Sequence, residues 1–488
     1  FEKLFFEVLN TPIEDRKVED KVTPFLNGGL FEARENDLYK DLKLIFPKNY
    51  FDELYNFLLS YNFTTDESTS QFQQVAIDPE MLGRIFENLL AEITEETGEQ
   101  ARKAKGAFYT PREIVDYMCK ESLKEYLKTK IKEDEFRDQR LYQLIEASDK
   151  DFNDQISNWR NKWKPYKENI IKALDELKVL DPACGSGAFP IGMLQLLVKV
   201  YERLESRFDS YKTKLGIIEK NIYGVDIEPM AIEISRLRTW LSIIVDEESD
   251  SKKIKPLPNL EFKFVCANSL IDLNNGTSVL GDDPDLDVKL QNIRDAYFNT
   301  ESLNKKKKLR LDYEKLVSGQ KNLFGESLRS KQLKTYRPFD NEVSAAFFDP
   351  EFMFGIKNFS MVIGNPPYIQ LQSKTSKEKN ELKSQNYQTY VATGDLYCLF
   401  YERGWELLGN DGVLSFITSN KWMRAGYGKA LRDFFIIKTN PIVLLDLGSN
   451  VFEGATVDTS ILIFSKSANS GRTKAIKITG AGIDKQVQ

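Results

Sequence analysis

The stretch Val179-Leu-Asp-Pro-Ala-Cys-Gly-Ser-Gly-Ala-Phe-Pro190 decides how the rest of this chain is interpreted. Its opening apolar pair predicts a buried strand, and the apolar run from Ile191 to Leu204 predicts a helix. Between them, Gly185 and Gly187 let the backbone approach a ligand closely at the start of that helix. Pro190 stands where the third glycine of a dinucleotide-binding loop would be. A pyrophosphate cofactor is therefore disfavoured, whereas an adenosyl ligand without phosphates remains open.

Two further strands are predicted downstream, and each carries polar residues at its end. Ile222–Val225 leads into Asp226 and then a helix, and Phe262–Cys266 leads into Asn268 and Ser269. An acid at the tip of the second strand is the expected partner of ribose hydroxyls. An acid before a helix is also a common N-cap, which is the alternative interpretation. Three strand ends in a row thus predict polar residues along one edge of a sheet.

A fourth predicted strand, Phe359–Ile363, breaks sharply after a glycine, and its end is where open α/β sheets place their chemistry. Asn365 offers a side-chain oxygen, and the double proline Pro366-Pro367 holds a backbone carbonyl rigidly. Tyr368 adds a flat aromatic face. Two rigid acceptors beside a ring suit a planar amino group such as that of adenine, whose lone pair they draw out of conjugation. A plain turn is the alternative interpretation of these four residues.

The amino-acid composition excludes several catalytic mechanisms. The chain has no histidine, so the commonest general base is unavailable, and a mechanism that needs no base suits it. Its four cysteines lie far apart, and no metal site is expected. No proline is followed by cysteine, which removes the usual nucleophile motif for methylating a ring carbon of cytosine.

Length and charge set the outer bounds. A chain of 488 residues with 41% hydrophobic content is expected to form about two to four domains. No apolar run is long enough to span a membrane and no signal peptide opens the chain, so we expect no membrane contact and a cytoplasmic location. The net charge of −6 implies that any nucleic-acid contact comes from local patches or from sequence outside this chain. Because the chain begins at Phe1, we expect it to be part of a longer protein.

We predict two domains. Residues 1–100, with a helix expected from Asp78, form a helical connector, and residues 101–488 form the α/β domain. The latter contains a helical insertion or covering layer at 120–178 and a basic insertion at 273–345. Within 301–337, eleven Lys and Arg stand against four Asp and Glu. This run is interpreted either as a solvated helix face or as a phosphate-contacting surface.

Taken in order, these motifs resemble those of the N6-adenine DNA methyltransferases in the gamma arrangement. The chain is most similar to the methylase region of type IIG restriction–modification enzymes, with type I modification subunits as more distant relatives. The resemblance covers about residues 80–470. It implies a class I S-adenosylmethionine-dependent methyltransferase fold: a seven-stranded, mostly parallel sheet with a reversed last strand, helices on both sides, and a small helical domain in front.

The resemblance also assigns the cofactor site. The loop Gly106–Thr110, in which Thr110 is expected to cap a helix starting at Pro111, matches the motif that closes over the methionine of S-adenosylmethionine. The remaining cofactor contacts implied are Tyr109, Asp181 and Ala183 at the methionine, Gly185 and Gly187 in the loop, Asp226 at the ribose, and Ile227, Asn268 and Ser269 at the adenine. Relatives often carry Asp at the position of Asn268, so here an acceptor is kept but its charge is lost.

The catalytic motif implied is Asn365-Pro366-Pro367-Tyr368, and Phe452 falls where relatives place a second aromatic residue against a flipped-out base. The expected activity is methyl transfer to N6 of adenine in double-stranded DNA, as the modification part of a restriction–modification system. Such enzymes carry a target-recognition domain after the methylase and, in type IIG, a nuclease before it. Both are expected to lie outside this chain.

Two alternatives stay open. A protein-glutamine N5-methyltransferase uses the same Asn-Pro-Pro-Tyr motif on a side-chain amide, although its members usually lack the Thr110-Pro111 motif and the long insertions. A non-catalytic scaffold subunit of a defence complex would keep the fold without the chemistry.

Overall fold

The computed structural model covers the α/β region far more fully than the first hundred residues. It describes residues 3–9, 11, 13–21, 23, 47–59, 62–63, 76–77, 110–131, 133, 137–148, 151–152, 166–205, 208–244, 258–274, 286–298, 300, 302–318, 328–340, 343–448, 451–452 and 457–478. The helix expected from Asp78 and the loop residue Tyr109 lie outside these ranges. The connector therefore stays a prediction. Its described elements are helical turns at Lys3–Val8, Ile13–Asp15 and Val18–Asp20, helix α1 (Tyr50–Leu59), and the parallel pair β1 (Asn62–Phe63) and β2 (Ala76–Ile77).

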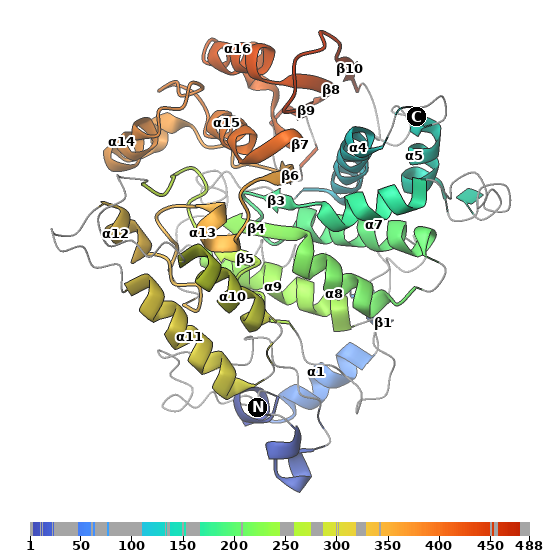
Figure 1. The fold of residues 1–488 in the computed structure, drawn as a ribbon, viewed down its shortest axis with the longest axis vertical. Coiled ribbons are helices and arrows are strands. Elements are labelled where there is room, and N and C mark those ends of the chain that lie inside the picture. Colours follow the sequence, from blue (N-terminus) through green and yellow to red (C-terminus); the bar gives the residue numbers. More distant parts are fainter. Residues whose placement is uncertain are drawn as a thin grey trace.

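An eight-stranded sheet forms the centre of the molecule, in the order β10-β8-β9-β7-β6-β3-β4-β5 (Figure 1). Its strands are β3 (Val179–Asp181), β4 (Ile222–Asp226), β5 (Phe264–Cys266), β6 (Phe359–Gly364), β7 (Leu408–Ser419), β8 (Asn440–Gly448), β9 (Thr459–Ser465) and β10 (Lys474–Lys477). Strand β9 is antiparallel to both β7 and β8, and the other pairings are parallel. Because β3 lies between β4 and β6, the strand order reverses beside β3, which is where such sheets bind ligands.

The expected sheet of seven strands with one reversed is confirmed, and β10 is an addition to it. This strand pairs with β8 from Lys474 opposite Val443 to Lys477 opposite Asp446, and all four of its residues are exposed. A short strand with a lysine at each end is a usual way to finish the edge of a sheet. Its pattern is too short and too polar for sequence periodicity to reveal it.

The sheet separates two hydrophobic cores, as alternate residues of the strands show. In β3, Val179 packs into the first core and Leu180 into the second, and in β6 the same division separates Met361 from Val362. The first core is covered by α4 (Arg112–Lys130), α5 (Arg137–Glu146), a helix at 166–176, α7 (Ala188–Leu204), α8 (Ser210–Lys220) and α9 (Pro229–Ile244). The second is covered by α10 (Leu286–Phe298), α11 (Leu303–Ser318), α12 (Leu328–Leu333), α13 (Pro350–Phe354), α14 (Ser376–Ser384), α15 (Tyr397–Leu407) and α16 (Gly428–Lys438).

Two segments differ from the sequence-based expectation. The boundary of the helical insertion, placed at residue 120, falls inside α4, whose buried residues Met118 and Leu123 belong to the first core. Helix α4 therefore belongs to the helical layer that covers the first core, and is not part of an insertion. The polar stretch 370–388, whose composition is typical of a loop, contains α14. Thr375 and Glu378 form a capping box at its start, a Thr-x-x-Glu signal that the sequence does carry.

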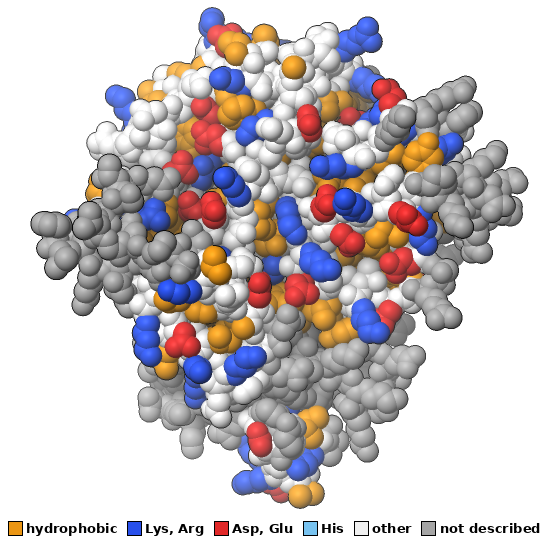
Figure 2. All heavy atoms as spheres, in the orientation of Figure 1, with side chains coloured by type: hydrophobic (Ala, Val, Ile, Leu, Met, Phe, Trp, Pro, Cys, Tyr) orange, Lys and Arg blue, Asp and Glu red, His pale blue; other side chains and the backbone are white. Residues whose placement is uncertain are grey.

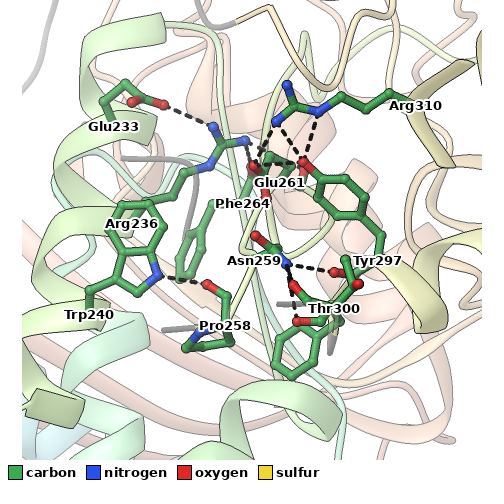
Figure 3. Close-up of polar contacts among 11 residues, drawn as sticks. Glu233, Arg236, Trp240, Pro258, Asn259, Glu261, Phe264, Tyr297, Thr300 and Arg310 are labelled. Atoms are coloured by element: carbon green, nitrogen blue, oxygen red, sulfur yellow. Dashed lines mark hydrogen bonds and ion pairs between the residues drawn. The ribbon is translucent and has the colours of Figure 1, made fainter. Parts of the chain in front are cut away.

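The basic insertion is attached to the sheet through a buried polar network (Figure 3). Arg310 of α11 donates to the Tyr297 hydroxyl at 2.7 Å and lies 3.9 Å from the Glu261 carboxylate. Arg236 of α9 donates to the Phe264 carbonyl at 2.7 Å, so the same network reaches β5. Arg310, a member of the basic run, therefore has a structural role.

Candidate active site

The loop between β3 and α7 takes the tight path that its glycines predict. Gly185 has a φ of 52° and Gly187 a φ of 87°, in the left-handed region that favours glycine. A Cβ at Gly187 would also lie 3.0 Å from the Ser235 hydroxyl oxygen. Gly187 is the N-cap of α7, so the loop delivers the chain to a helix N-terminus beside the carboxyl end of the sheet.

Helix α9 holds this loop from behind through two residues that sequence reasoning did not single out. Ser235 donates its hydroxyl to the Gly185 carbonyl at 2.8 Å, and Arg238 donates to the Ser186 carbonyl at 2.8 Å. Both side chains are buried. The signal that could have identified them is the number of polar residues at 235–242 in a helix that is otherwise apolar, since Arg236, Thr239 and Ser242 are buried as well.

Asp181, at the tip of β3, is a buried carboxylate facing this loop. One oxygen, Oδ1, accepts from the Ala183 backbone N–H at 3.1 Å. The other, Oδ2, has no hydrogen-bond partner in the described part of the chain. Burial raises the pKa of Asp181 well above its ordinary range, and the neighbouring Asp226 adds to the shift. A cationic ligand would offset both effects.

Asp226, at the tip of β4, accepts from two backbone N–H groups: Gly185 at 2.9 Å and Glu228 at 2.8 Å. Burial raises the pKa of this carboxyl too. A carboxylate has acceptor capacity beyond two bonds, so hydroxyl partners remain possible. The next residue, Ile227, is 59% exposed and offers an apolar surface at the same strand tip.

The end of β5 is tied to the same loop. The Ser269 hydroxyl, buried, donates to the Pro182 carbonyl at 2.5 Å, and the Asn268 side-chain oxygen accepts from the Leu270 N–H at 3.2 Å. Ser269 therefore supports the loop through its side chain. Asn268 keeps its second oxygen lone pair and its amide nitrogen for other contacts.

The predicted catalytic corner, Gly364 with the motif at 365–368, lies directly against Asp181. A Cβ built on Gly364, the last residue of β6, would lie 2.6 Å from Asp181 Oδ1, closer than real contacts allow. Glycine is therefore required here for the two strand tips to approach each other. Asn365 follows at once, and Pro366 behind it is buried. The strand end expected to carry chemistry thus adjoins the strand end expected to bind the cofactor.

Thr110 reaches the same corner from a distant part of the sequence. Its hydroxyl oxygen accepts from the Asn365 side-chain nitrogen at 3.2 Å, and Thr110 itself is buried. The prediction that Thr110 caps a helix beginning at Pro111 is wrong. Helix α4 begins at Arg112, its N-cap residue is Pro111, and no side chain caps it, because the Thr110 hydroxyl is turned toward Asn365 instead.

Three aromatic rings meet behind Asn365. The ring centroids of Tyr368 and Phe452 are 6.2 Å apart with an interplanar angle of 63°, and those of Tyr368 and Tyr397 are 6.0 Å apart at 80°. Phe452 is 3% exposed and also packs into the first core. A base stacked between two parallel rings needs a separation of about 7 Å, two ring contacts of about 3.5 Å each. In this arrangement the rings contact each other edge to face, so a base between them requires them to move apart.

Of the sixteen site residues named from the sequence, Tyr109 lies outside the described ranges. Asp181, Asp226 and Asn268 lie at or just after the carboxyl ends of β3, β4 and β5, and the motif at 365–368 follows β6. Thr110 and Phe452 come from other parts of the chain and contact this motif through a hydrogen bond to Asn365 and a ring contact with Tyr368. The groups at these strand ends suit a cationic ligand that carries an adenosyl group. They combine a buried carboxylate, Asp181, a half-buried carboxylate, Asp226, both of raised pKa, with a glycine cradle that lacks a third glycine and with an exposed isoleucine. No cluster of three potential metal-ligating side chains, and no helix apolar and long enough for a bilayer, occurs among the described residues.

Strand order, reversed β9, glycine loop and strand-tip carboxylates together define a class I methyltransferase fold. Comparison with known proteins then gives the family. Residues 220–452 match the Eco57I restriction-modification methylase family, and residues 155–273 match the MmeI DNA-methyltransferase domain. The chain belongs to the methylases of restriction–modification enzymes, as its motifs indicate.

Individual relatives agree with this placement. A putative type II restriction enzyme and methyltransferase of Methanocaldococcus jannaschii is 31% identical over 95% of this chain and 44% of its own length. An adenine-specific methyltransferase, PglX, of Streptomyces coelicolor is 24% identical over 62% of this chain and 22% of its own length. The solved structure of the type IIL enzyme MmeI, in complex with DNA, shares the fold with a TM-score of 0.51 at 17% identity, covering 96% of this chain and 49% of that one. This chain spans less than half the length of each of them.

Proposed function

We propose that this chain transfers a methyl group from S-adenosylmethionine to the N6 amino group of adenine in double-stranded DNA, as the modification part of a restriction–modification system. The contact between Gly364 and Asp181 is the observation that carries the proposal. It supports the proposal because the strand end that precedes Asn365 lies against a buried carboxylate suited to a cationic cofactor. Relatives named adenine-specific support the choice of base.

The cofactor would be held by the strand tips. Asp181 and the backbone near Ala183 would face its ammonium group, Asp226 its ribose, and Ile227 its adenine ring. When bound, S-adenosylmethionine supplies an electrophilic methyl group. Helix α9 holds the loop between Gly185 and Gly187 in place, because Ser235 and Arg238 donate to the Gly185 and Ser186 carbonyls.

The chain's own residues would prepare the amino group. The Asn365 side-chain oxygen and the Pro366 carbonyl would accept hydrogen bonds from its two N–H groups, which draws the nitrogen lone pair out of conjugation with the ring. The nitrogen that takes the methyl group would then release one proton to water. Tyr368 contributes a stacking face and not a base, because burial raises the pKa of its hydroxyl well above its ordinary range. The target base must leave the DNA helix to reach this corner, at a cost of a few kcal/mol. Contact with Tyr368 and Phe452 would offset part of that cost once the rings separate.

The complete enzyme is proposed to include parts outside this chain. A target-recognition domain would choose the DNA sequence, and a nuclease would be fused to the methylase or act as a separate subunit. The length of the relatives supports a larger protein, since this chain covers 44% of the Methanocaldococcus relative and 24% of the Escherichia coli enzyme RM.Eco57I.

The direct test is to incubate the protein with methyl-labelled S-adenosylmethionine and duplex DNA, digest the DNA to nucleosides, and identify the labelled product by mass spectrometry. We expect label in N6-methyladenine. Label on protein glutamine with none on DNA would instead indicate the glutamine methyltransferase. Tight cofactor binding with no transfer to either substrate would indicate a scaffold. Because a missing recognition domain could limit the reaction, the complete open reading frame is assayed beside this chain.

A further inference from the structure

The hydrogen bond between Thr110 and Asn365 joins residues 255 positions apart. It does so at the point where α4 begins, beside the carboxyl end of β6. Thr110 is 4% exposed, and the first turn of α4 does not use its hydroxyl. The N–H groups of Ile114 and Val115 are accepted by the Pro111 carbonyl, at 3.0 and 3.1 Å. The Thr110 side chain thus serves the catalytic corner and not the helix.

The backbone of Asn365 is already restricted by its neighbours, so the hydrogen bond to Thr110 affects mainly the side chain. Gly364 before it lies against the Asp181 carboxylate, and two prolines follow it. What remains is rotation of the side-chain amide, which has an acceptor on one side and a donor on the other. The amino group of a substrate can donate only to the amide oxygen. If the Asn365 amide were rotated by half a turn, its own N–H groups would face the N–H groups of the substrate.

In the structure the amide nitrogen points to the Thr110 oxygen. Since a planar amide places its oxygen away from its nitrogen, this bond turns Oδ1 away from Thr110. Thr110 is suited to the task because it is buried, β-branched and followed by a proline, which together restrict its own side chain and backbone.

We propose that Thr110 is a positioning residue for Asn365, holding the amide so that its oxygen faces the target amino group. The inference rests on the proposed function of Asn365. It differs from the role that resemblance to the family gives Thr110, which is contact with the methionine part of the cofactor. The two roles separate experimentally: a cofactor contact changes the dissociation constant of S-adenosylmethionine, whereas a positioning residue changes the transfer rate once both substrates are saturating.

The test replaces Thr110 in the protein used for the methylation assay. Thr110→Val keeps the shape and removes the acceptor, and Thr110→Ser keeps the hydroxyl. We expect the single-turnover rate of N6-methyladenine formation to fall about tenfold to a hundredfold in Thr110→Val, as for a misplaced reacting group. Thr110→Ser should restore most of the rate. Calorimetric dissociation constants for S-adenosylmethionine should match the unmodified protein in both variants.

Thr129→Val is the matched control. Thr129 lies on the same helix and donates its hydroxyl to the Tyr126 carbonyl at 2.7 Å, so this variant loses one hydrogen bond far from the catalytic corner. Thermal unfolding checks that each variant folds, and Thr110→Ala replaces Thr110→Val if the latter does not.

A full transfer rate in Thr110→Val overturns the inference. So does weaker cofactor binding with an unchanged rate at saturation, which would make Thr110 a cofactor contact. If the unmodified protein and the complete open reading frame form no N6-methyladenine, the proposed function fails and this inference fails with it. That outcome is distinguishable because it appears before any variant is made.

Discussion

Asp181 is the residue at which the two halves of the site meet. Its Oδ1 accepts from Ala183 in the cofactor loop and also lies against Gly364 of the catalytic strand. A single side chain therefore contacts both the loop proposed to bind the cofactor and the strand end proposed to receive the target base. The sequence predicts a role for Asp181 and for Asn365 separately. It does not predict their proximity, because that depends on the register between β3 and β6.

Gly364→Ala is expected to disturb both halves at once. The new Cβ would lie 2.6 Å from a carboxylate oxygen that the Ala183 N–H already holds, so the strand tips must separate. We predict a loss of about 1–3 kcal/mol in the free energy of unfolding, measured with urea, together with weaker binding of S-adenosylmethionine. Gly426→Ala is the control, since nothing lies within 4 Å of a Cβ there and its φ is not in the left-handed region. Equal effects of the two substitutions would contradict the close approach.

Asp181→Asn should change how stability depends on pH. Burial raises the pKa of Asp181 above its ordinary value of 3.8, so the native state binds this proton more tightly than the unfolded chain does. The cofactor-free protein therefore loses stability through this group as the pH rises above about 4. We predict that Asp181→Asn removes this loss. Relative to wild type, the variant should become more stable between pH 5 and pH 8, measured by urea unfolding, while binding S-adenosylmethionine less tightly. Parallel pH profiles would contradict the assignment.

At the level of elements, α11 decides how the basic insertion is interpreted. Lys306 is buried and Arg310 is bonded inside the network of Figure 3, so part of the charge has a structural role. Lys305, Lys307 and Lys308 are exposed on the outer side of the helix. Figure 2 shows blue side chains along the region where Figure 1 places α11. The two interpretations of this run, a solvated helix face and a phosphate-contacting surface, therefore concern only its exposed residues.

Lys308→Glu distinguishes a phosphate-contacting surface from a solvated helix face. If Lys308 contacts a phosphate, duplex DNA binds more weakly and the slope of log affinity against log salt falls by about one unit. Fluorescence anisotropy over a salt series measures both quantities. Lys172→Glu, in the helix at 166–176 on the opposite core, is the control because Lys172 is 76% exposed on its side chain. An unchanged slope in Lys308→Glu would indicate a solvated face.

The sequence predicts some elements better than others, for physical reasons. Strands β3, β4 and β6 are predicted closely because each is a short apolar run that stops at an acid or a glycine. Strand β10 and helix α14 are missed, because one is an exposed edge and the other is polar nearly throughout. The sequence also does not predict the hydrogen bonds that hold the site residues in place. Ser235, Arg238 and the Thr110 bond act across distant elements, and no local pattern gives those distances.

For the whole molecule, the proposed cofactor links the strand tips of one sheet. S-Adenosylmethionine that binds only the folded state should therefore stabilise the entire α/β domain and not one loop. At a hundred times its dissociation constant we predict an increase of about 2.7 kcal/mol in the free energy of unfolding. Differential scanning calorimetry with and without the ligand measures the accompanying rise in the midpoint. S-Adenosylmethionine that leaves the midpoint unchanged at saturating concentration would argue against the cofactor site.

The central claim is that Asn365 prepares an adenine amino group for methylation. It is tested most directly by single-turnover methyl transfer in Asn365→Ala, with N6-methyladenine measured by mass spectrometry and cofactor binding by calorimetry. We predict that S-adenosylmethionine binding and the thermal midpoint remain near those of the unmodified protein, while the transfer rate falls about a hundredfold to a thousandfold, as when one preorganised hydrogen-bonding group is lost. N6-methyladenine formed at a near-normal rate by Asn365→Ala would contradict the account.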